Sequence, residues 1–455
     1  MRKQLVLPVL FFLTMTAEVD GLFPDHLWTP MRLFGWLVTS LPIKLTPLEL
    51  VCWVLIYQGF ARTREARVPA MSRMVMWSFG GLAFAAAYGL ARGGEFKPIY
   101  TQVHGFVVGL TFALAVAVTL EEPEDHWRMV QALVYAALYR AVCVFIVYLK
   151  FRGDILPACM TTHEDTALFV TALLALAISA FEARTPASLR HLMLGGPVLL
   201  LAIQLNNRRL AWVALAAGLI TLYFLVPSKT ELSRQINRAI KIAIPLVLLY
   251  VLVGWGRTER IFKPLAAFAS MGAGTKDDST IARDNEDMGM VLMTTDRPLL
   301  GTGLGHEWLE VDASRTVPTD VFPMYHYSPH NSVLAMFAFC GALGFAALWM
   351  AYPVAVHLLA RTYRAAPEPM VRAISAIGIC GIVVCMNQLY GDMGMVCLTP
   401  MTIAGTAMGA AMRMPWFGGL WAQEASDQTD PTDPTEAAPP EFEVEVAEPM
   451  VSRRS

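Results

Sequence analysis

Long apolar runs alternate with short polar connections over most of the chain, from Leu5 to Met412. A helix rises about 1.5 Å per residue, so about 20 apolar residues cross the ~30 Å hydrocarbon layer of a membrane. Because backbone groups in lipid need partners within their own segment, helices are favoured over open strands. The pattern predicts an all-α integral membrane protein with about twelve transmembrane helices, at 5–19, 45–61, 74–91, 103–119, 129–149, 166–182, 191–205, 210–226, 240–255, 330–351, 370–390 and 394–413.

Two apolar segments near the beginning of the chain depart from this pattern. The first run follows Arg2 and Lys3 in the manner of a signal peptide, but no small-residue cleavage site follows it. We expect this run to remain as the first helix. Residues 29–44 are apolar but contain Pro30 and Pro42, and we expect them to lie along the outer membrane interface.

The basic residues between the apolar runs predict the orientation, because Lys and Arg prefer cytoplasmic connections. With twelve helices, the basic connections all fall on one side, together with both termini. These residues are Arg62, Arg64, Arg67 and Arg73, then Arg184 and Arg190, then Lys229, Arg234, Arg238 and Lys241, and finally Arg361, Arg364 and Arg372.

This arrangement divides the chain into four regions. Residues 1–255 contain the first nine helices, residues 256–329 form one large loop on the outer side, and residues 330–413 contain the last three helices. Loops of this length without an obvious helix or strand period are usually functional. After Met414 the composition changes to Asp, Glu, Thr and Pro, so residues 414–455 are expected to be a disordered acidic cytoplasmic tail.

The composition narrows the classes of partner and cofactor. Hydrophobic residues make up 55% of the chain and charged residues 16%, which excludes a wetted surface on all sides. The formal charge of -2, with basic residues in short clusters, argues against a nucleic-acid partner. The cysteines lie mostly inside apolar runs without metal-binding spacing, so buried free thiols are expected. Asp277-Asp278 is an isolated acidic pair, and we predict no metal and no cofactor.

A first candidate site is the turn Asn206-Asn207-Arg208-Arg209, on the side where arginine is disfavoured. The stretch from His191 to Val226 is about 54 Å long as a helix, too long for one crossing and short for two. The arginines are therefore expected at or below the outer surface, where a charge needs a water-filled cavity and a partner. The alternative is a snorkelling pair that caps the hairpin and contacts lipid headgroups.

A second candidate lies where the large loop ends. Pro329 disfavours helical angles at Ser328, so a helix is expected to begin close to His330. The positive end of the helix dipole disfavours imidazolium, which predicts a neutral base. The alternative is a histidine that only caps the helix or sits in the interfacial belt.

Glycines within the loop, from Gly301 to Gly305, resemble a nucleotide-binding loop. No βαβ unit surrounds them, so we expect backbone flexibility near a ligand instead.

Permanent cations beside a neutral base suit a substrate with a diphosphate leaving group and a hydroxyl nucleophile. The guanidinium fork binds phosphate oxygens at two points and keeps its charge. The base would take the proton of the attacking hydroxyl. The pattern therefore favours group transfer at the outer leaflet.

The stretch 206–376 resembles the O-antigen ligase and O-antigen polymerase superfamily of bacterial membrane glycosyltransferases. The first half of the chain resembles it only in helix number and orientation. The motifs that carry the resemblance occur in the family's order, and they are Arg209-Leu210-Ala211-Trp212, the Ser-rich segment from Ser279 to Arg283, Pro298 to Gly303, His330-Asn331, and Gly341-Ala342-Leu343-Gly344.

The resemblance implies a fold like that of C-type glycosyltransferases, all helical with one large periplasmic loop, which works without metal or nucleotide sugar and inverts the anomeric centre. It implies that His330 is the general base or positions the acceptor. Arg209 and Arg283 would hold an undecaprenyl diphosphate, with Arg208 assisting. Many relatives have a small residue in place of Arg208, so the division of work between the two hairpin arginines is open.

Three further residues are expected near the substrate. Asn331 and Arg297 adjoin the family motifs and are predicted to bind substrate. Arg140 lies within the fifth predicted helix, where it either lines the same cavity or forms a structural ion pair.

The function implied is transfer of a glycan from an undecaprenyl-diphosphate carrier at the periplasmic face of the bacterial inner membrane. In a ligase the acceptor is lipid A-core, whereas in a polymerase it is another lipid-linked glycan; we favour the ligase type. Teichoic, exopolysaccharide or protein acceptors stay open. A transporter of lipid-linked glycans is the alternative of another class, but transporters commonly show paired half-repeats, and this chain is asymmetric.

Overall fold

The computed structural model describes residues 3–17, 45–61, 67–257, 278–312 and 324–420, except 155, 158, 184, 228, 229 and 393, together with 259, 262 and 265. The predicted interfacial segment 29–44, the first aspartate of the pair at 277, and residues 421–455 of the predicted tail lie outside this part of the chain.

Within the described residues all regular structure is helical and no strand is present, which confirms the predicted all-α class. The elements are α1 (Lys3–Ala17), α3 (Pro47–Gly59), α4 (Pro69–Ala91), α5 (Phe96–Thr119), α6 (Pro123–Lys150), α7 (Asp165–Ala183), α8 (Pro186–Asn206), α9 (Arg209–Leu225), α10 (Glu231–Gly254), α12 (Asp278–Asp296), the 3₁₀ turn η4 (Tyr325–Tyr327), α13 (Ser332–Trp349), α14 (Ala351–Ala365), α15 (Pro369–Gly391), the 3₁₀ turn η5 (Gly394–Val396) and α16 (Leu398–Phe417).

Eight helical segments of the described chain are long and apolar enough to cross a membrane: α4, α5, α6, α7, α8, α10, the continuous run of α13 and α14, and α15. The helices α1, α3 and α9 are apolar but shorter. Each predicted run coincides with a helix, yet the predicted number of twelve spans is not confirmed. Three of the four remaining runs form helices shorter than 18 residues, and the fourth, α16, is 20 residues long but is not among the eight candidates.

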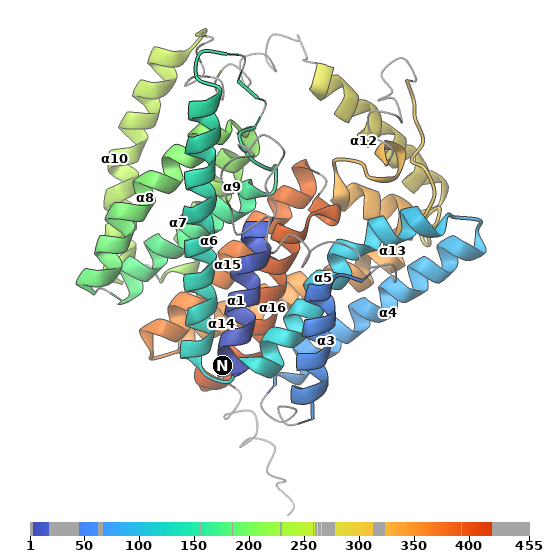
Figure 1. Ribbon diagram of the computed structural model, residues 1–455, viewed down its shortest axis with the longest axis horizontal. Coiled ribbons are helices and arrows are strands. Elements are labelled where there is room, and N and C mark those ends of the chain that lie inside the picture. Colours follow the sequence, from blue (N-terminus) through green and yellow to red (C-terminus); the bar gives the residue numbers. More distant parts are fainter. Residues whose placement is uncertain are drawn as a thin grey trace, which may run out of the picture.

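A helix in the large loop was not predicted. The loop showed no clear helical period, but α12 occupies its middle part (Figure 1). The side chains that α12 buries include Met290 and Met293 and also Asn285 and Glu286. Because polar residues take half of these buried positions, the apolar period that normally reveals a helix is interrupted.

The centre of the molecule is the contact between α5 and α16, which lie side by side near the middle of Figure 1. Small residues allow the two backbones to approach closely. A Cβ atom at Gly109 would lie 2.9 Å from the Met401 carbonyl oxygen, and one at Gly405 would lie 2.3 Å from the Gly109 carbonyl oxygen. Close packing through small residues is a usual way for helices to associate in lipid.

The two ends of α15 contact different connections between helices. At its beginning, Arg372 forms an ion pair with Glu182 at the end of α7, with Nε and Oε2 3.0 Å apart. At its other end, Asp392 bonds to Arg208 between α8 and α9. Figure 1 shows α12 at the upper end of the bundle and the N-terminus at the lower end. The hairpin and the large loop thus share one end.

Candidate functional site

The N-terminus of α13 forms the first part of the site. Asn331 is the N-cap residue, and its side-chain oxygen accepts a hydrogen bond from the backbone N–H of Leu334 at 3.1 Å. The helix begins at Ser332, two residues after His330, as Pro329 predicted. His330 therefore lies just before the helix, with its ring outside the first turn.

His330 is paired with Glu286 of α12. Its Nδ1 atom lies 3.0 Å from each carboxylate oxygen, and its backbone N–H donates to Oε2 at 2.9 Å. The carboxylate is 1% exposed, whereas the imidazole is 28% exposed. A carboxylate only accepts hydrogen bonds, so it assigns the ring proton to Nδ1 and leaves the lone pair of Nε2 available. In the neutral form of the ring, this contact fixes the tautomer and directs the basic Nε2 atom away from Glu286.

Two neighbours complete the surroundings of this pair. The Tyr325 phenol lies beside Glu286; its pKa is raised by burial and then by the charge of that carboxylate. The pKa of Asp287 is also raised by burial, while a hydrogen bond to Asn331 and the charge of Arg283 act in the opposite direction. Tyr325 thus lies beside the pair, and the contact between Asp287 and Asn331 connects α12 to the beginning of α13.

Arg283 lies on α12 one turn before Glu286 and Asp287, on the same side of the helix. Its guanidinium is partly buried, and its Nε atom has no hydrogen-bond partner within the described part of the chain. The structure thus places a permanent cation one helical turn from the histidine pair.

The arginine hairpin forms the second part of the site. Asn207 ends α8 in the left-handed conformation with φ 59°, and Arg208 is the N-cap of α9. An Arg208 nitrogen lies 2.6 Å from Asp392 Oδ2, and Nδ1 of His163 lies 3.2 Å from the same oxygen. Arg209 is exposed at the first position of α9.

The charge of Asp392 is strongly stabilised. Burial alone would raise its pKa, but the hydrogen bond from His163 and the charge of Arg208 hold it well below its usual range. Arg208 is therefore bound to a buried carboxylate.

The connection between α6 and α7 supports the hairpin. Arg140 of α6 binds Asp165 with Nε and Oδ1 2.8 Å apart, and it donates to the Thr162 hydroxyl at 3.1 Å. Asn206 accepts from the backbone N–H of Met160 at 2.9 Å. Both members of the ion pair are almost fully buried, at 1% and 2% exposure. Arg140 thus forms a structural ion pair that fixes this connection.

The glycine motifs pack against each other instead of forming a flexible loop. The backbone N–H of Gly303 donates to the Phe339 carbonyl at 2.9 Å, and that of Ala342 donates to the Pro298 carbonyl at 2.8 Å. Gly341 has φ +64°, and a Cβ atom there would lie 2.3 Å from the Leu299 carbonyl carbon. A side chain could not be accommodated, so close backbone approach explains the glycines.

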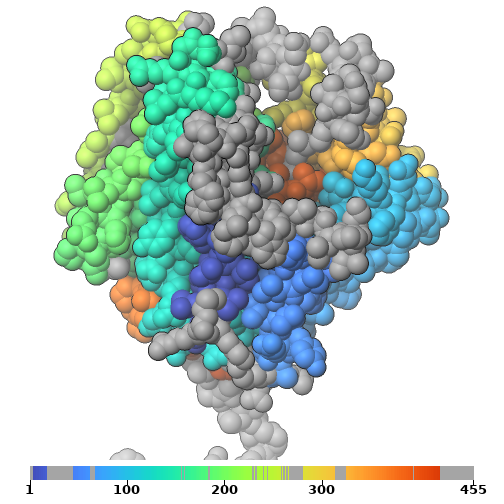
Figure 2. Space-filling model, viewed as in Figure 1, coloured from blue at the N-terminus to red at the C-terminus, as the bar shows by residue number. Residues whose placement is uncertain are grey.

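One hydrogen bond joins the two parts of the site. The backbone N–H of Met395 donates to the Ser332 hydroxyl at 3.1 Å. His330 lies two residues before Ser332, and Asp392 lies three residues before Met395. Figure 2 shows the orange-red surface near the end of α15 recessed between the green side of the molecule and the gold side with α12 and α13. The beginning of α13 is thus linked to the segment after α15, whose Asp392 binds the hairpin.

Arg297, by contrast, lies apart from the histidine pair. It follows the end of α12, about 21 Å along the helix axis from Arg283. It forms an ion pair with Asp296 at 3.2 Å. The prediction that it binds substrate with the other arginines would require a substrate that extends along α12.

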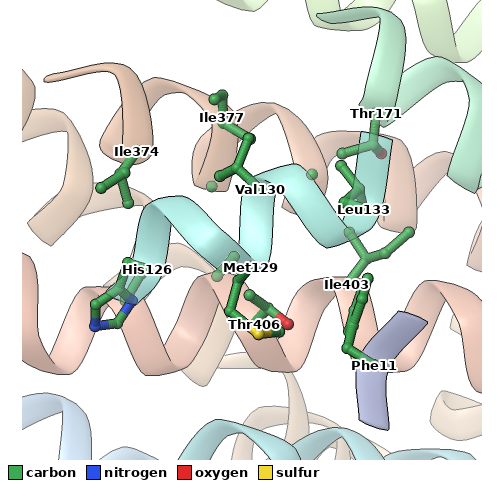
Figure 3. Close-up of a pocket in the computed structure, with 14 residues that line it drawn as sticks. Phe11, His126, Met129, Val130, Leu133, Thr171, Ile374, Ile377, Ile403 and Thr406 are labelled. Carbon is green, nitrogen blue, oxygen red and sulfur yellow. The ribbon is translucent and has the colours of Figure 1, made fainter. Parts of the chain in front are cut away.

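The apolar cavity in Figure 3 is a different feature. It lies between α1, α6, α7, α15 and α16, and its polar side chains are His126, Thr171 and Thr406. Its described lining contains no arginine and no carboxylate. It does not offer the charges that a diphosphate requires.

Sequence reasoning did not identify Glu286, His163 or Asp392. Asp392 could have been recognised from the sequence, since it is a charged residue between two apolar runs on the side of the hairpin. Glu286 carried no such signal, because it is one of several acidic residues in a polar stretch. Its role follows from the contact with His330.

Residues 194–349 match the family model described as O-antigen ligase. The matched segment contains the hairpin arginines, Arg283, Glu286 and His330, whereas His163 and Asp392 lie outside it. The match confirms the predicted resemblance to the O-antigen ligase and polymerase superfamily. A comparison with curated proteins finds no match for the chain.

Proposed function

We propose that this chain, which carries an O-antigen ligase domain at residues 194–349, transfers a glycan from an undecaprenyl-diphosphate carrier to an acceptor hydroxyl at the periplasmic face of the bacterial inner membrane. The observation that carries the proposal is the pairing of His330 with the buried Glu286, close in the chain to the Ser332–Met395 hydrogen bond that links this segment to the one after Asp392, the partner of Arg208. The acceptor proposed is lipid A-core, which makes the protein a ligase.

The proton transfer in this mechanism belongs to His330. The acceptor oxygen attacks the anomeric carbon and forms the new glycosidic bond, while the bond from that carbon to the diphosphate oxygen breaks. The hydroxyl proton passes to Nε2 of His330, and the bonding electron pair leaves with the undecaprenyl diphosphate. Glu286 stabilises the imidazolium that forms, since its carboxylate contacts Nδ1.

The arginines have different roles in stabilising the leaving diphosphate. Arg209, exposed at the beginning of α9, and Arg283, one turn from the histidine pair, neutralise the charge that develops on the leaving diphosphate. Arg208 is bound to Asp392, so it positions the hairpin and contributes charge indirectly. We propose this division between the two hairpin arginines.

Asn331 and Arg140 are positioning residues in this proposal. The Asn331 oxygen caps α13, and its side chain also bonds to Asp287, so both contacts fix the segment that carries His330. Arg140 holds the connection that supports Asn206 and His163.

A transfer assay with full-length protein in lipid nanodiscs tests the proposal. Lipid-linked O-antigen and lipid A-core are supplied, and the glycosylated product is measured. His330→Ala is expected to abolish transfer, and Asp154→Asn, an exposed carboxylate in the connection after α6, serves as the control. Transfer by His330→Ala at the rate of the unchanged protein would contradict the assignment.

The side of the membrane can be tested separately. The described cysteines are all buried, so a new surface cysteine gives a specific signal. Met288→Cys on α12 is expected to react with an impermeant maleimide added outside spheroplasts, and Arg190→Cys at the beginning of α8 is not. The reverse pattern would place the histidine pair in the cytosol, out of reach of a periplasmic donor.

The glycans that accumulate in a strain without the gene distinguish a ligase from a polymerase. A strain without the gene is expected to accumulate uncapped lipid A-core together with polymer on the carrier lipid. Single repeat units attached to lipid A-core would instead identify a polymerase.

A further inference from the structure

A second polar hollow lies along the last turns of α12, and we call it the α12 cleft. Its lining consists of Arg92, Leu292, Met293, Asp296, Arg297, Thr302, His306, Glu307, Trp308, Leu309, Glu310 and His326. These residues come from the end of α4, from α12, from the segment after the glycine motif, and from η4. The cleft therefore adjoins the site described above without sharing its charged residues.

The turn η4 separates the α12 cleft from the histidine pair. Tyr325 lies beside Glu286, and the next residue, His326, lines the cleft. The backbone N–H of Trp308 donates to the His326 carbonyl at 2.8 Å, and the indole N–H donates to the Tyr325 carbonyl at 3.1 Å. A single turn, held by these two hydrogen bonds, therefore lies between the α12 cleft and the histidine pair.

The same wall is tied to the helix bundle. Gln102 of α5 accepts from the backbone N–H of Gly305 at 2.7 Å and donates to the Tyr327 carbonyl at 2.9 Å. Both sides of the cleft are thus fixed by a buried side chain. A preformed hollow of this kind is typical of a binding site.

Two polar atoms in the lining have no partner within the described residues. These are Nε2 of His306 and the Thr302 hydroxyl oxygen, both buried. The pKa of His306 is lowered by burial and then by the charges of Arg92 and Arg297, while a hydrogen bond with the Gly89 backbone acts in the opposite direction. Buried polar atoms are usually hydrogen-bonded, so they indicate a ligand that supplies donors and acceptors.

The charges in the lining indicate which ligand fits. Two guanidinium groups, those of Arg92 and Arg297, face three carboxylates, those of Asp296, Glu307 and Glu310. A phosphate would meet more negative than positive charge. Sugar hydroxyls both donate and accept hydrogen bonds, so they can satisfy carboxylates, guanidinium groups and a neutral imidazole together.

We propose that the α12 cleft binds uncharged, hydroxyl-rich sugar residues next to the glycan bond that is formed at His330. The proposal rests on the proposed function, because it takes the glycan from the same reaction. The sugars belong either to the donor glycan or to the acceptor, and binding measurements distinguish these sources.

The test uses full-length protein in nanodiscs and two soluble probes. The probes are neutral oligosaccharides released by mild acid from the host's lipopolysaccharide, one from the O-antigen and one from the core. Saturation-transfer NMR and calorimetry are expected to show binding of one probe. Asp296→Asn combined with Arg92→Gln should weaken it about tenfold, because charge-assisted hydrogen bonds are lost.

Matched controls are provided by the connection after α6. Asp154→Asn combined with Arg152→Gln makes the same chemical changes at exposed positions away from the cleft. These changes are expected to leave oligosaccharide binding unchanged. Equal binding by the cleft variant and the control variant, or no binding of either probe to the unchanged protein, would overturn the proposal.

Two further measurements separate this inference from the catalytic assignment. His330→Ala should bind the oligosaccharide normally while it fails to transfer, since the cleft does not include His330. If this variant still transfers and the cleft variant loses binding, the catalytic assignment fails and the cleft remains supported. Displacement of the sugar by inorganic pyrophosphate would show an anion site and overturn the cleft proposal.

Discussion

Two histidine–carboxylate pairs lie in the two parts of the candidate site. His330 contacts Glu286 at 3.0 Å, and His163 contacts Asp392 at 3.2 Å, each through Nδ1. Both carboxylates are nearly buried, at 1% and 4% exposure. In distance and in the burial of the carboxylate the two pairs are almost alike.

Their neighbours differ. Asp392 also binds the guanidinium of Arg208 at 2.6 Å, so its charge is already matched by a permanent cation. Glu286 lies beside a phenol, which supplies no charge. The direct contact with Arg208 is therefore expected to leave Asp392 with less electrostatic support for an imidazolium than Glu286 has. The proposed roles of the two pairs, proton acceptor for His330 and positioning for His163, therefore follow from the group beside each carboxylate: the Tyr325 phenol beside Glu286 and the Arg208 guanidinium beside Asp392.

The largest effect is expected from His330→Gln. Removing a general base typically lowers the rate by about 10²–10⁴-fold, and this change is expected to lower kcat within that range. Measurement of lipid A-core glycosylation in nanodiscs checks it. Retention of more than a tenth of the activity, with normal insertion, would show that His330 is not the base.

Glu286→Gln is expected to lower kcat by about 100-fold, because the imidazolium loses its counter-charge while the side-chain volume is kept. The KM for the donor should change little, since Glu286 is buried behind His330. Glu286→Asp, which restores the charge, should recover part of kcat. An increase in donor KM without loss of kcat would instead indicate a structural role.

Asp392→Asn is expected to destabilise the protein by about 2 kcal/mol at pH 7 and to lower activity about tenfold, since Arg208 and His163 lose their shared partner. The folded pKa of Asp392 is lowered, so its stabilisation is present above the ordinary value of about 3.9 and is lost as the pH falls through the folded value. Thermal unfolding in detergent should therefore show the largest difference between the two proteins near neutral pH. A constant difference down to pH 3 would contradict the ion pair.

The smallest effect is expected from His163→Gln. The imidazole is 49% exposed, and the amide can still donate to Asp392, so transfer should change less than about threefold. The same assay as for His330→Gln makes the two histidines directly comparable. A loss as large as that of His330→Gln would make both pairs catalytic and remove the distinction between them.

The sequence predicted much of the helix pattern and part of the site. The apolar runs located helices correctly, although counting them gave twelve spans where eight helical segments in the described part have sufficient length and apolarity. The beginning of α13 was predicted because proline acts on its immediate neighbour. The α12 helix was not predicted, since polar residues occupy its buried side.

The site residues divide in the same way. His330, Arg209 and Arg283 were candidates because their residue types and neighbouring motifs carry a local signal. Arg140 was predicted either to line the cavity or to form a structural ion pair, and it forms a buried ion pair with Asp165. Arg297 was grouped with the other arginines, but the length of α12 places it beside a different cleft.

What the sequence determined by itself is local: apolar length, helix ends, and glycine where a backbone must turn or approach closely. These follow from neighbouring dihedral angles and from the transfer of short segments into lipid. The tertiary structure decided the partners, since Glu286 lies 44 residues from His330 and Arg208 lies 184 residues from Asp392. A contact across such separations depends on how whole helices pack, and no short-range pattern along the chain encodes it.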